Sequence, residues 1–377
     1  MNVAFCIPQF KPANLPLQPW LTVYRVAMSL RDRGDNVHVI TDEGVPEEFD
    51  HIHVNVVDSL RGTNSKQIVR QLQTIEPDSV IVTVTPLSLA TACWYQILHR
   101  YKAYGYLSYP FYTWKQILRA FPHICLRDRL EYGRHVLVPK RAWADRLVRI
   151  FDAVICQSTH TVQKIASLTK SKIDAYAIPP GIDMDRWASE ISPKSIHSTD
   201  YFLYLGTASR IRGFKLLLDA FSRISDSDIR LKILARGADE TKLKEIKNAV
   251  VRYNLNNRVT IQGGWLETDE IKKQIQSAAA VLFPFILVPS EFPVSVLEAI
   301  YCGTPVVITD LVNLPQALCN AAIVVPHANV QKLASTIQKL HRQKEYQAEL
   351  VAACNQLRKG IRTWDSVCKE WQYFLTR

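Results

Sequence analysis

The sequence predicts an α/β protein made of two doubly wound parallel-sheet domains. Three observations lead to this prediction. Short apolar segments typical of buried strands alternate with helical patterns of about ten to fifteen residues. The alternation begins again near residue 201, after a polar stretch. A length of 377 residues suits two domains of ordinary size, and a hydrophobic content of 47% is enough for two cores.

In the first half, a proline-rich loop through Pro8, Pro12, Pro16 and Pro19 follows the first strand. Six apolar segments are expected to form strands: residues 2–7, 36–41, 51–57, 79–84, 104–107 and 151–156. Helices are expected from about residue 20 to residue 34 and over residues 66–74, 87–101 and 159–168. Ligands of such sheets bind beyond the carboxyl ends of the strands.

The second half begins after residues 177–183 and a polar stretch to Asp200 that we interpret as a connector. Strands are expected over residues 201–205, 230–234, 259–261, 280–284, 306–309 and 323–326. Helices are expected over residues 214–224, 242–253 and 268–277, after Pro293, and from residue 326 to the end. The two halves therefore share one architecture.

The stretch of residues 288–310 is the strongest candidate for a binding site. It opens as a loop, Pro293 suits a first helical turn, and Gly303 closes the helix. Glu291 lies in the loop and Glu298 within the helix. A helix N-terminus offers unpaired N–H groups to an anion, and a carboxylate one turn further can hold vicinal hydroxyls. We predict a sugar-nucleotide site here; the alternative is that both glutamates are ordinary surface charges.

The loop of residues 206–213 is the second candidate. It joins a strand to a helix and has a glycine at each end, so it can place backbone amides and a helix dipole near a phosphate. Arg212 can bind a phosphate bidentately, and Arg210 can add a second cation. The alternative is that both arginines are surface charges.

Composition excludes several other classes. The eight cysteines are scattered without a Cys-x-x-Cys pair, which is typical of buried free thiols in a reducing compartment. The N-terminus lacks a signal-peptide pattern, and the longest apolar run is too short to span a membrane. We therefore expect a cytoplasmic protein that is not integral to a membrane.

Over half of the net charge of +11 lies in residues 114–149, where nine Lys and Arg face three Asp and Glu, a balance of +6. Large apolar residues are interleaved with these charges. A basic amphipathic surface of this kind is typical of peripheral membrane contact, at the inner face of the cytoplasmic membrane. No nucleic-acid motif accompanies the charge. The alternative is a solvated helical face.

The stretch 288–310 resembles the donor-binding motif of family 4 glycosyltransferases: Glu, seven residues, Glu, then Ala-x-x-x-Gly-x-Pro-Val-Val. Glu298-Ala299 and residues 303–307, Gly-Thr-Pro-Val-Val, keep the second part. Six residues separate Glu291 from Glu298, and an alignment without a gap gives Ser290 the first Glu position and Glu291 that of the following Gly.

Three further segments resemble the same family. The loop 206–213 is similar to its Gly-Arg-x-x-x-x-Lys-Gly loop, with Thr207 at the Arg position and Arg212 at the Lys position. Residues 178–183, Ile-Pro-Pro-Gly-Ile-Asp, resemble its interdomain segment, and residues 363–371 resemble its terminal Trp-containing helix. The resemblance thus covers essentially the whole chain.

The resemblance implies the GT-B fold: two Rossmann-like doubly wound parallel-sheet domains facing a cleft, with a C-terminal helix crossing back. Residues 1–185, completed by 360–377, would form the acceptor domain, and residues 186–359 the donor domain. The implied activity is transfer, with retention, of a sugar from a nucleotide-diphosphate sugar to a glycan or lipid-linked acceptor. No metal or other cofactor is implied.

Site residues follow from these motifs. Glu291 would contact the sugar and Arg212 the diphosphate, so both are the expected catalytic residues. The expected donor-binding residues are Gly206, Thr207, Arg210, Arg212, Glu291, Phe292, Pro293, Val294 and Glu298. The expected acceptor-side and membrane-side residues are Ser108, Tyr109, Arg134, Lys140 and Arg141.

The first half departs from the family pattern. The family often has a Gly-Gly loop after the first strand and a His at the end of a central strand, whereas this chain has the proline-rich loop and residues 104–110, Tyr-Gly-Tyr-Leu-Ser-Tyr-Pro. Two alternatives therefore stay open: a non-catalytic relative that binds a partner or a glycan, and another enzyme on this fold, such as a sugar-nucleotide epimerase or a glycogen-type transferase.

Overall fold

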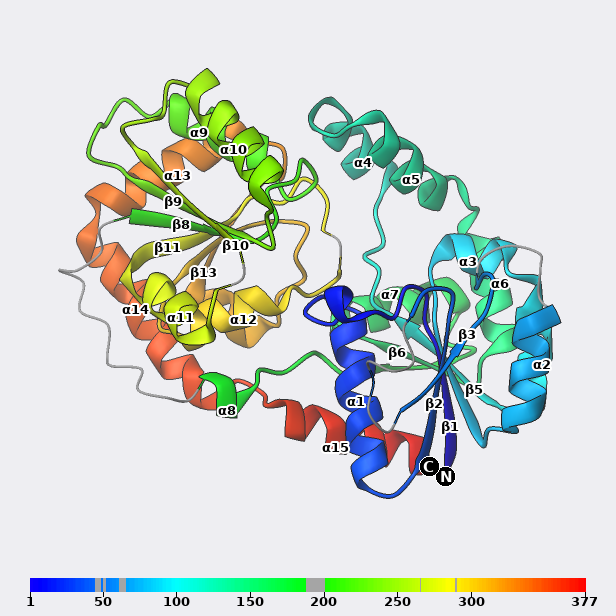
Figure 1. Ribbon diagram of the computed structural model, residues 1–377. Helices are drawn as coiled ribbons and strands as arrows, with labels where there is room; N and C mark the ends of the chain where they lie inside the picture. The colour runs from blue at the N-terminus through cyan, green and yellow to red at the C-terminus, as the bar shows by residue number, and fades with distance from the viewer. Residues whose placement is uncertain (45–48, 50–51, 61–65, 188–200, 265, 289) are drawn as a thin grey trace.

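The computed structural model describes residues 1–377 except 45–48, 50–51, 61–65, 188–200, 265 and 289. Two α/β units, each built around one parallel sheet, lie side by side (Figure 1). Most of the expected connector, residues 188–200, falls outside the described residues. Within the described part of the chain, every helix is too short or too polar to cross a membrane.

The N-terminal sheet has seven parallel strands in the order β3-β2-β1-β4-β5-β6-β7. Its strands are β1 (Asn2–Cys6), β2 (Asn36–Thr41), β3 (His53–Val56), β4 (Ser79–Thr83), β5 (Lys102–Leu107), β6 (Ala153–Cys156) and β7 (Asp174–Ala177). Its helices are α1 (Trp20–Asp32), α2 (Lys66–Ile75), α3 (Pro86–Thr91), α4 (Trp114–Ala120), α5 (Leu126–Leu137), α6 (Lys140–Ile150) and α7 (Thr159–Thr169). The central strands β1, β4 and β6 are almost entirely buried, as their unbroken apolar sequences predict.

The C-terminal sheet has six parallel strands in the order β10-β9-β8-β11-β12-β13. Its strands are β8 (Tyr201–Leu205), β9 (Leu231–Arg236), β10 (Val259–Gly264), β11 (Ala278–Phe283), β12 (Val306–Thr309) and β13 (Ala322–Val325). Helices of this half are α8 (Met184–Trp187), α9 (Phe214–Ser222), α10 (Glu240–Arg252), α11 (Thr268–Ser277), α12 (Val294–Tyr301), α13 (Val330–Arg342) and α14 (Lys344–Leu357). The predicted two-domain α/β architecture is therefore confirmed.

The last helix, α15 (Trp364–Thr376), leaves the C-terminal unit and packs on α1 of the N-terminal unit (Figure 1). Trp371 and Phe374 belong to the same hydrophobic core as β1 and α1. Two segments thus connect the units, and they touch: Ile182 donates its N–H to the Arg362 carbonyl at 2.9 Å. A Cβ on Gly181 would lie 2.6 Å from the Thr363 carbonyl carbon, so only glycine allows this approach.

Several elements differ from the sequence prediction. The expected helix over residues 87–101 is interrupted at Ala92, which is extended, so that α3 is followed by a 3₁₀ helix over Cys93–Arg100. Strand β7 was not predicted, because its sequence Asp-Ala-Tyr-Ala is short and only half-buried. Strand β9 continues to Arg236, two residues beyond the predicted end. The extents of β7 and β9 follow from pairing with neighbouring strands, which local propensity does not encode.

The cysteines agree with the prediction in part. Cys6, Cys156, Cys302, Cys354 and Cys368 are buried, and within the described part of the chain they form no disulfide. Cys93 and Cys125 are exposed, and Cys319 is half-buried. The first five therefore act as small apolar core residues.

Candidate active site

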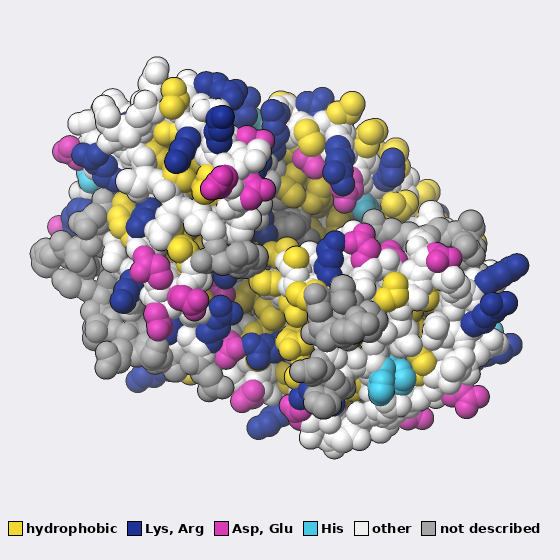
Figure 2. Space-filling model, in the orientation of Figure 1, with side chains coloured by type: hydrophobic (Ala, Val, Ile, Leu, Met, Phe, Trp, Pro, Cys, Tyr) yellow, Lys and Arg dark blue, Asp and Glu magenta, His cyan; other side chains and the backbone are white. Residues whose placement is uncertain are grey.

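A cleft of about 1450 Å³ lies between the two sheets and is lined by both units. The carboxyl ends of β1, β4, β8 and β9 open into it through Cys6, Thr83, Leu205 and Arg236. Figure 2 shows apolar side chains along the hollow between the units. A single small-molecule site usually takes ~300–1,000 Å³, so the cleft has room for two substrates.

The loop after β8 forms one wall of the cleft. Gly206 has φ +136°, and a Cβ there would lie 3.2 Å from the Arg212 guanidinium, which therefore rests against the loop backbone. Gly213 has φ +77°, and a Cβ there would lie 1.7 Å from the Pro284 carbonyl oxygen. These glycines let α9 begin directly beside β11 and direct the neighbouring Arg212 into the cleft.

Arg212 lines the cleft and forms no ion pair with a carboxylate of the described residues. Burial lowers the pKa of its guanidinium, and the nearby Arg236 guanidinium also lowers it, while Tyr204 and Tyr132 raise it. Thr207 lines the cleft as an exposed residue of the same loop. The loop therefore provides one uncompensated cation at the cleft.

Arg236, which the sequence analysis missed, is the second cation of this wall. It ends β9, the strand beside β8, and lines the cleft with Gly237. Arg210, which was expected to supply this charge, is exposed and absent from the described lining of the cleft. The sequence did contain a signal for Arg236, because Arg236-Gly237 directly follows an apolar strand. Neighbouring parallel strands end at the same edge of a sheet, so this arginine could have been expected near the loop after β8.

Glu298 lies one turn into α12 and faces the same space. Its side chain is 13% exposed, and its Oε2 has no hydrogen-bond partner among the described residues. The closest cation is Arg236, whose Nη1 lies 3.9 Å from Oε2. Burial raises the pKa of Glu298, although Arg236 and Arg186 oppose this rise. A buried acceptor without a donor is suited to a ligand hydroxyl.

Glu291 does not line the cleft. The side chain is fully buried, and its carboxylate accepts hydrogen bonds from the hydroxyls of Ser158 and Thr161 and from the backbone N–H of Gln157, all in the N-terminal unit. This placement does not support the expected contact with a donor sugar. The physical reason is that the carboxylate is hydrogen-bonded at the N-terminus of α7, where the helix dipole also favours a negative charge.

The neighbours of Glu291 divide between cleft and core. Ser290, Pro293 and Val294 line the cleft, whereas Phe292 is buried in the C-terminal core. Ser290, not Glu291, therefore presents its side chain at the start of α12. This agrees with the alignment without a gap, in which Ser290 takes the first Glu position of the motif.

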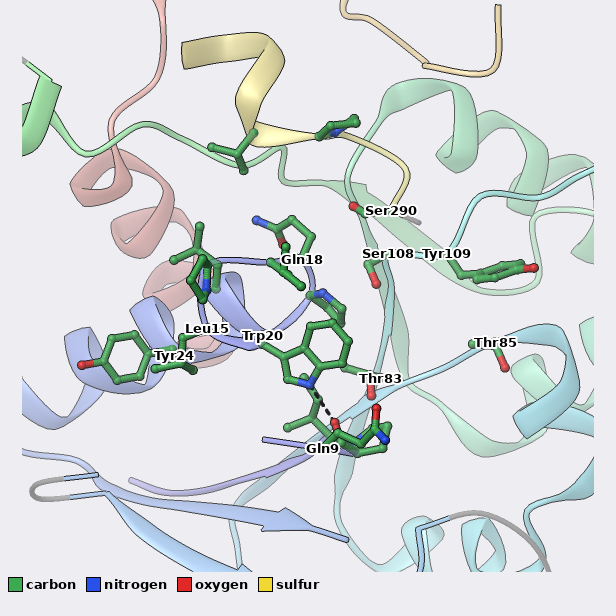
Figure 3. Close-up of a pocket in the computed structure, with 18 of the residues that line it drawn as sticks. Gln9, Leu15, Gln18, Trp20, Tyr24, Thr83, Thr85, Ser108, Tyr109 and Ser290 are labelled. Atoms are coloured by element: carbon green, nitrogen blue, oxygen red, sulfur yellow. Dashed lines mark hydrogen bonds between the residues drawn. The ribbon is translucent and has the colours of Figure 1, made fainter. Parts of the chain in front are cut away.

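On the N-terminal side, Gln18 carries a directed donor. Its Oε1 accepts from the Thr22 hydroxyl at 2.7 Å and from Gln157 Nε2 at 3.1 Å, which fixes the carboxamide. Its Nε2 has no partner among the described residues, although the residue is only 8% exposed and lines the cleft (Figure 3). Gln157 in turn accepts from the Ser290 hydroxyl at 3.2 Å. Hydrogen bonds from Gln18 through Gln157 to Ser290 thus connect the two walls of the cleft.

Ser108 and Tyr109 both line the cleft where β5 ends, on the side of Ser290 (Figure 3). The Ser108 carbonyl accepts the Glu291 N–H at 2.8 Å. The Tyr109 ring stacks on His135 of α5 with centroids 4.4 Å apart, and burial raises the pKa of its hydroxyl. The structure therefore brings a histidine to this strand end from a distant segment, which spacing in the sequence could not indicate.

Helices α4 and α5 project from the N-terminal unit (Figure 1), and α5 lines part of the cleft. Several large apolar side chains there are exposed: Trp114 46%, Leu118 58%, Leu126 69%, Leu130 54% and Leu137 66%. Figure 2 shows apolar side chains interleaved with Lys and Arg on this part of the surface. Arg134 lines the cleft, whereas Lys140 and Arg141 are exposed at the start of α6. Other apolar residues of the region, Ile117, Trp143 and Leu147, are buried in the cores.

Residues 185–356 match the family model described as Glycosyl transferases group 1. The C-terminal unit of the chain is therefore a domain of this glycosyltransferase group. No curated protein sequence gives a significant match. Among the described residues, no group of three or more His, Cys, Asp or Glu is arranged to hold a metal ion.

Solved structures of similar fold cover almost the entire chain. Sucrose-phosphate synthase from Thermosynechococcus elongatus is 16% identical over 99% of this chain and 97% of that chain, with a TM-score of 0.72. HepE from Anabaena, solved with UDP, is 16% identical over 100% of both chains, with a TM-score of 0.71. WaaG, a glycosyltransferase involved in lipopolysaccharide biosynthesis, is 15% identical over 99% of both chains, with a TM-score of 0.66. The GT-B fold is therefore shown.

Proposed function

We propose that the protein transfers a sugar, with retention, from a nucleotide-diphosphate sugar to an acceptor hydroxyl. The observation that carries this proposal is the group formed by Arg212, Arg236 and Glu298 at the carboxyl edge of the C-terminal sheet. Two guanidiniums suit a diphosphate, and a buried carboxylate oxygen without a donor suits the ribose hydroxyls. HepE was solved with UDP and with UDP-glucose, which favours a uridine nucleotide here.

In this proposal, Arg212, Arg236 and the amides of the Gly206 loop stabilise the charge that develops on the leaving diphosphate. The bond from the anomeric carbon to the diphosphate oxygen breaks, and a bond to the acceptor oxygen forms on the same face. The acceptor proton passes to the departing phosphate oxygen. Ser290 and Gln18 are the polar groups positioned to orient sugar and acceptor hydroxyls. The arginines supply the positive charge, so the proposal includes no metal.

Thermal unfolding with UDP, GDP and ADP and their sugars tests the donor assignment. A ligand at ~100 times its dissociation constant adds ~2.7 kcal/mol to the stability of the folded state. We expect uridine nucleotides to raise Tm and the Glu298→Gln variant to lose most of this rise, because an amide replaces one carboxylate acceptor with a donor.

Glu267→Gln is the matched control, because Glu267 precedes α11 and is absent from the described cleft lining. If no nucleotide on the panel raises Tm, the donor proposal fails. If another base stabilises the wild type, the uridine assignment is wrong while the site remains.

For the acceptor, we propose a glycan or lipid-linked molecule held at a membrane surface, reached from the cytoplasmic side. The exposed apolar residues of α4 and α5 support this, and Leu126 and Leu130 among them also line the cleft entrance. An apolar patch with interleaved arginines is suited to the boundary between headgroups and acyl chains. The acceptor would then enter the cleft from the same surface that docks on the lipid.

Flotation with anionic vesicles tests the membrane contact. We expect the wild type to float with vesicles containing phosphatidylserine and a triple variant neutralising Arg134, Lys140 and Arg141 to partition less. Each basic group contributes on the order of 1 kcal/mol, so the loss is roughly 100-fold.

A second triple variant, neutralising Lys244, Lys247 and Arg252 of α10, controls for net charge alone, since this helix belongs to the other unit. The membrane proposal is wrong if both variants lose vesicle binding equally, or if the wild type does not float with the vesicles.

A further inference from the structure

The buried carboxylate of Glu291 forms hydrogen bonds that have no part in the proposed sugar transfer. It comes from the C-terminal half, yet it accepts hydrogen bonds from Ser158, Thr161 and the Gln157 N–H, which belong to the N-terminal half. The Gln157 N–H lies 3.2 Å from Oε2, and both hydroxyls donate to Oε1. A fully buried carboxylate is costly unless several donors satisfy it, and here both oxygens are satisfied across the boundary between the units.

The N-terminal partners form a preformed anion site. Ser158 is the N-cap of α7. Its Oγ accepts a hydrogen bond from the Thr161 N–H at 3.1 Å, and its hydroxyl donates a hydrogen bond to Glu291. The helix has eleven residues and presents its positive dipole end to the carboxylate. Burial raises the pKa of Glu291, and the hydrogen bonds from Ser158, Thr161, Gln157 and Asn313 lower it.

The residues beside Glu291 also bind the N-terminal half. The Tyr112 hydroxyl donates to the Val288 carbonyl at 2.7 Å and accepts the Val288 N–H at the same distance. Gln157 Oε1 accepts the Phe292 N–H at 3.2 Å. The described residues of segment 288–292 are thus fixed to the opposite unit immediately before α12, the helix that carries Glu298.

We infer that Glu291 is a positioning residue that holds Val288 and residues 290–292 of the donor domain on the N-terminal unit, at the N-terminus of α7, and so fixes the width of the cleft. The inference rests on the proposed function only for its catalytic consequence. Both oxygens of Glu291 are engaged away from the cleft, so they do not contact a substrate. The clamp instead sets the distance between Ser290 and Glu298 on one wall and Gln18 and Ser108 on the other.

Small-angle X-ray scattering of the full chain tests the clamp without any substrate. We expect Glu291→Ala to increase the radius of gyration relative to the wild type, because the carboxylate that joins the units is gone. Thr161→Val removes one donor from the N-terminal side at nearly constant volume, and we expect a change in the same direction. This second variant decides the question if Glu291→Ala does not fold. Glu349→Ala, an exposed position on α14, is the control.

Binding and turnover provide the second readout. We expect Glu291→Ala to bind free nucleotide diphosphate like the wild type but to lose about 100-fold in kcat, since misplacing groups by about 1 Å has this effect. An unchanged radius of gyration in both variants overturns the clamp. A loss of nucleotide-sugar affinity with nucleotide affinity intact and unchanged scattering would assign Glu291 to the sugar instead. If the wild type binds no nucleotide, the proposed function fails, but scattering still decides the clamp.

Discussion

Replacing Arg212 with alanine is expected to lower kcat by about 100- to 1,000-fold, the effect of removing one preorganised donor from a developing anion. Arg212 is held against Gly206 at the carboxyl end of β8 and has no carboxylate partner among the described residues. Its charge is therefore available to a leaving diphosphate. Steady-state kinetics with the donor identified by thermal unfolding measure the change.

Two companion variants sharpen this experiment. Arg212→Lys keeps the charge but loses the bidentate geometry, so we expect an intermediate loss. Arg210→Ala removes a cation two residues away whose side chain is exposed outside the cleft, and we expect little change in kcat. If Arg210→Ala loses as much activity as Arg212→Ala, the distinction between the two arginines is wrong.

Replacing Trp371 with alanine is expected to destabilise the N-terminal unit by about 3–5 kcal/mol, the usual cost of deleting a buried Trp side chain. Trp371 is 1% exposed, packs edge-to-face on Tyr106 of β5 with centroids 5.3 Å apart, and lies in the core shared with α1. Calorimetry is the measurement. We expect a fall of roughly 10 °C in the transition of the N-terminal unit.

The indole N–H of Trp371 has no hydrogen-bond partner among the described residues, so Trp371→Phe should lose packing alone and cost less. Tyr373→Ala, on the exposed face of the same helix at 61% exposure, should change stability by less than about 0.5 kcal/mol. If Trp371→Ala shifts only the transition of the C-terminal unit, α15 does not stabilise the N-terminal core in solution.

The sequence alone determined the architecture because buried parallel strands are apolar and periodic. Segments such as residues 36–41 and 201–205 agree with the observed strands residue for residue. The two glycines of the loop 206–213 and the proline–glycine pattern of residues 293–303 also indicated where strand-to-helix junctions occur. These features depend on the backbone, whose requirements are local, so neighbouring residues suffice to reveal them.

Which side chains enter the cleft was decided by tertiary structure. Glu291 and Ser290 are adjacent in the chain, but only the position of α7 in the other unit shows that Glu291 is bound there and Ser290 faces the cleft. Arg236 and His135 reach the cleft from elements far away in the sequence. Motif spacing describes residues along one element, whereas a site between two sheets depends on where separate elements meet, and that is set by packing of the whole chain.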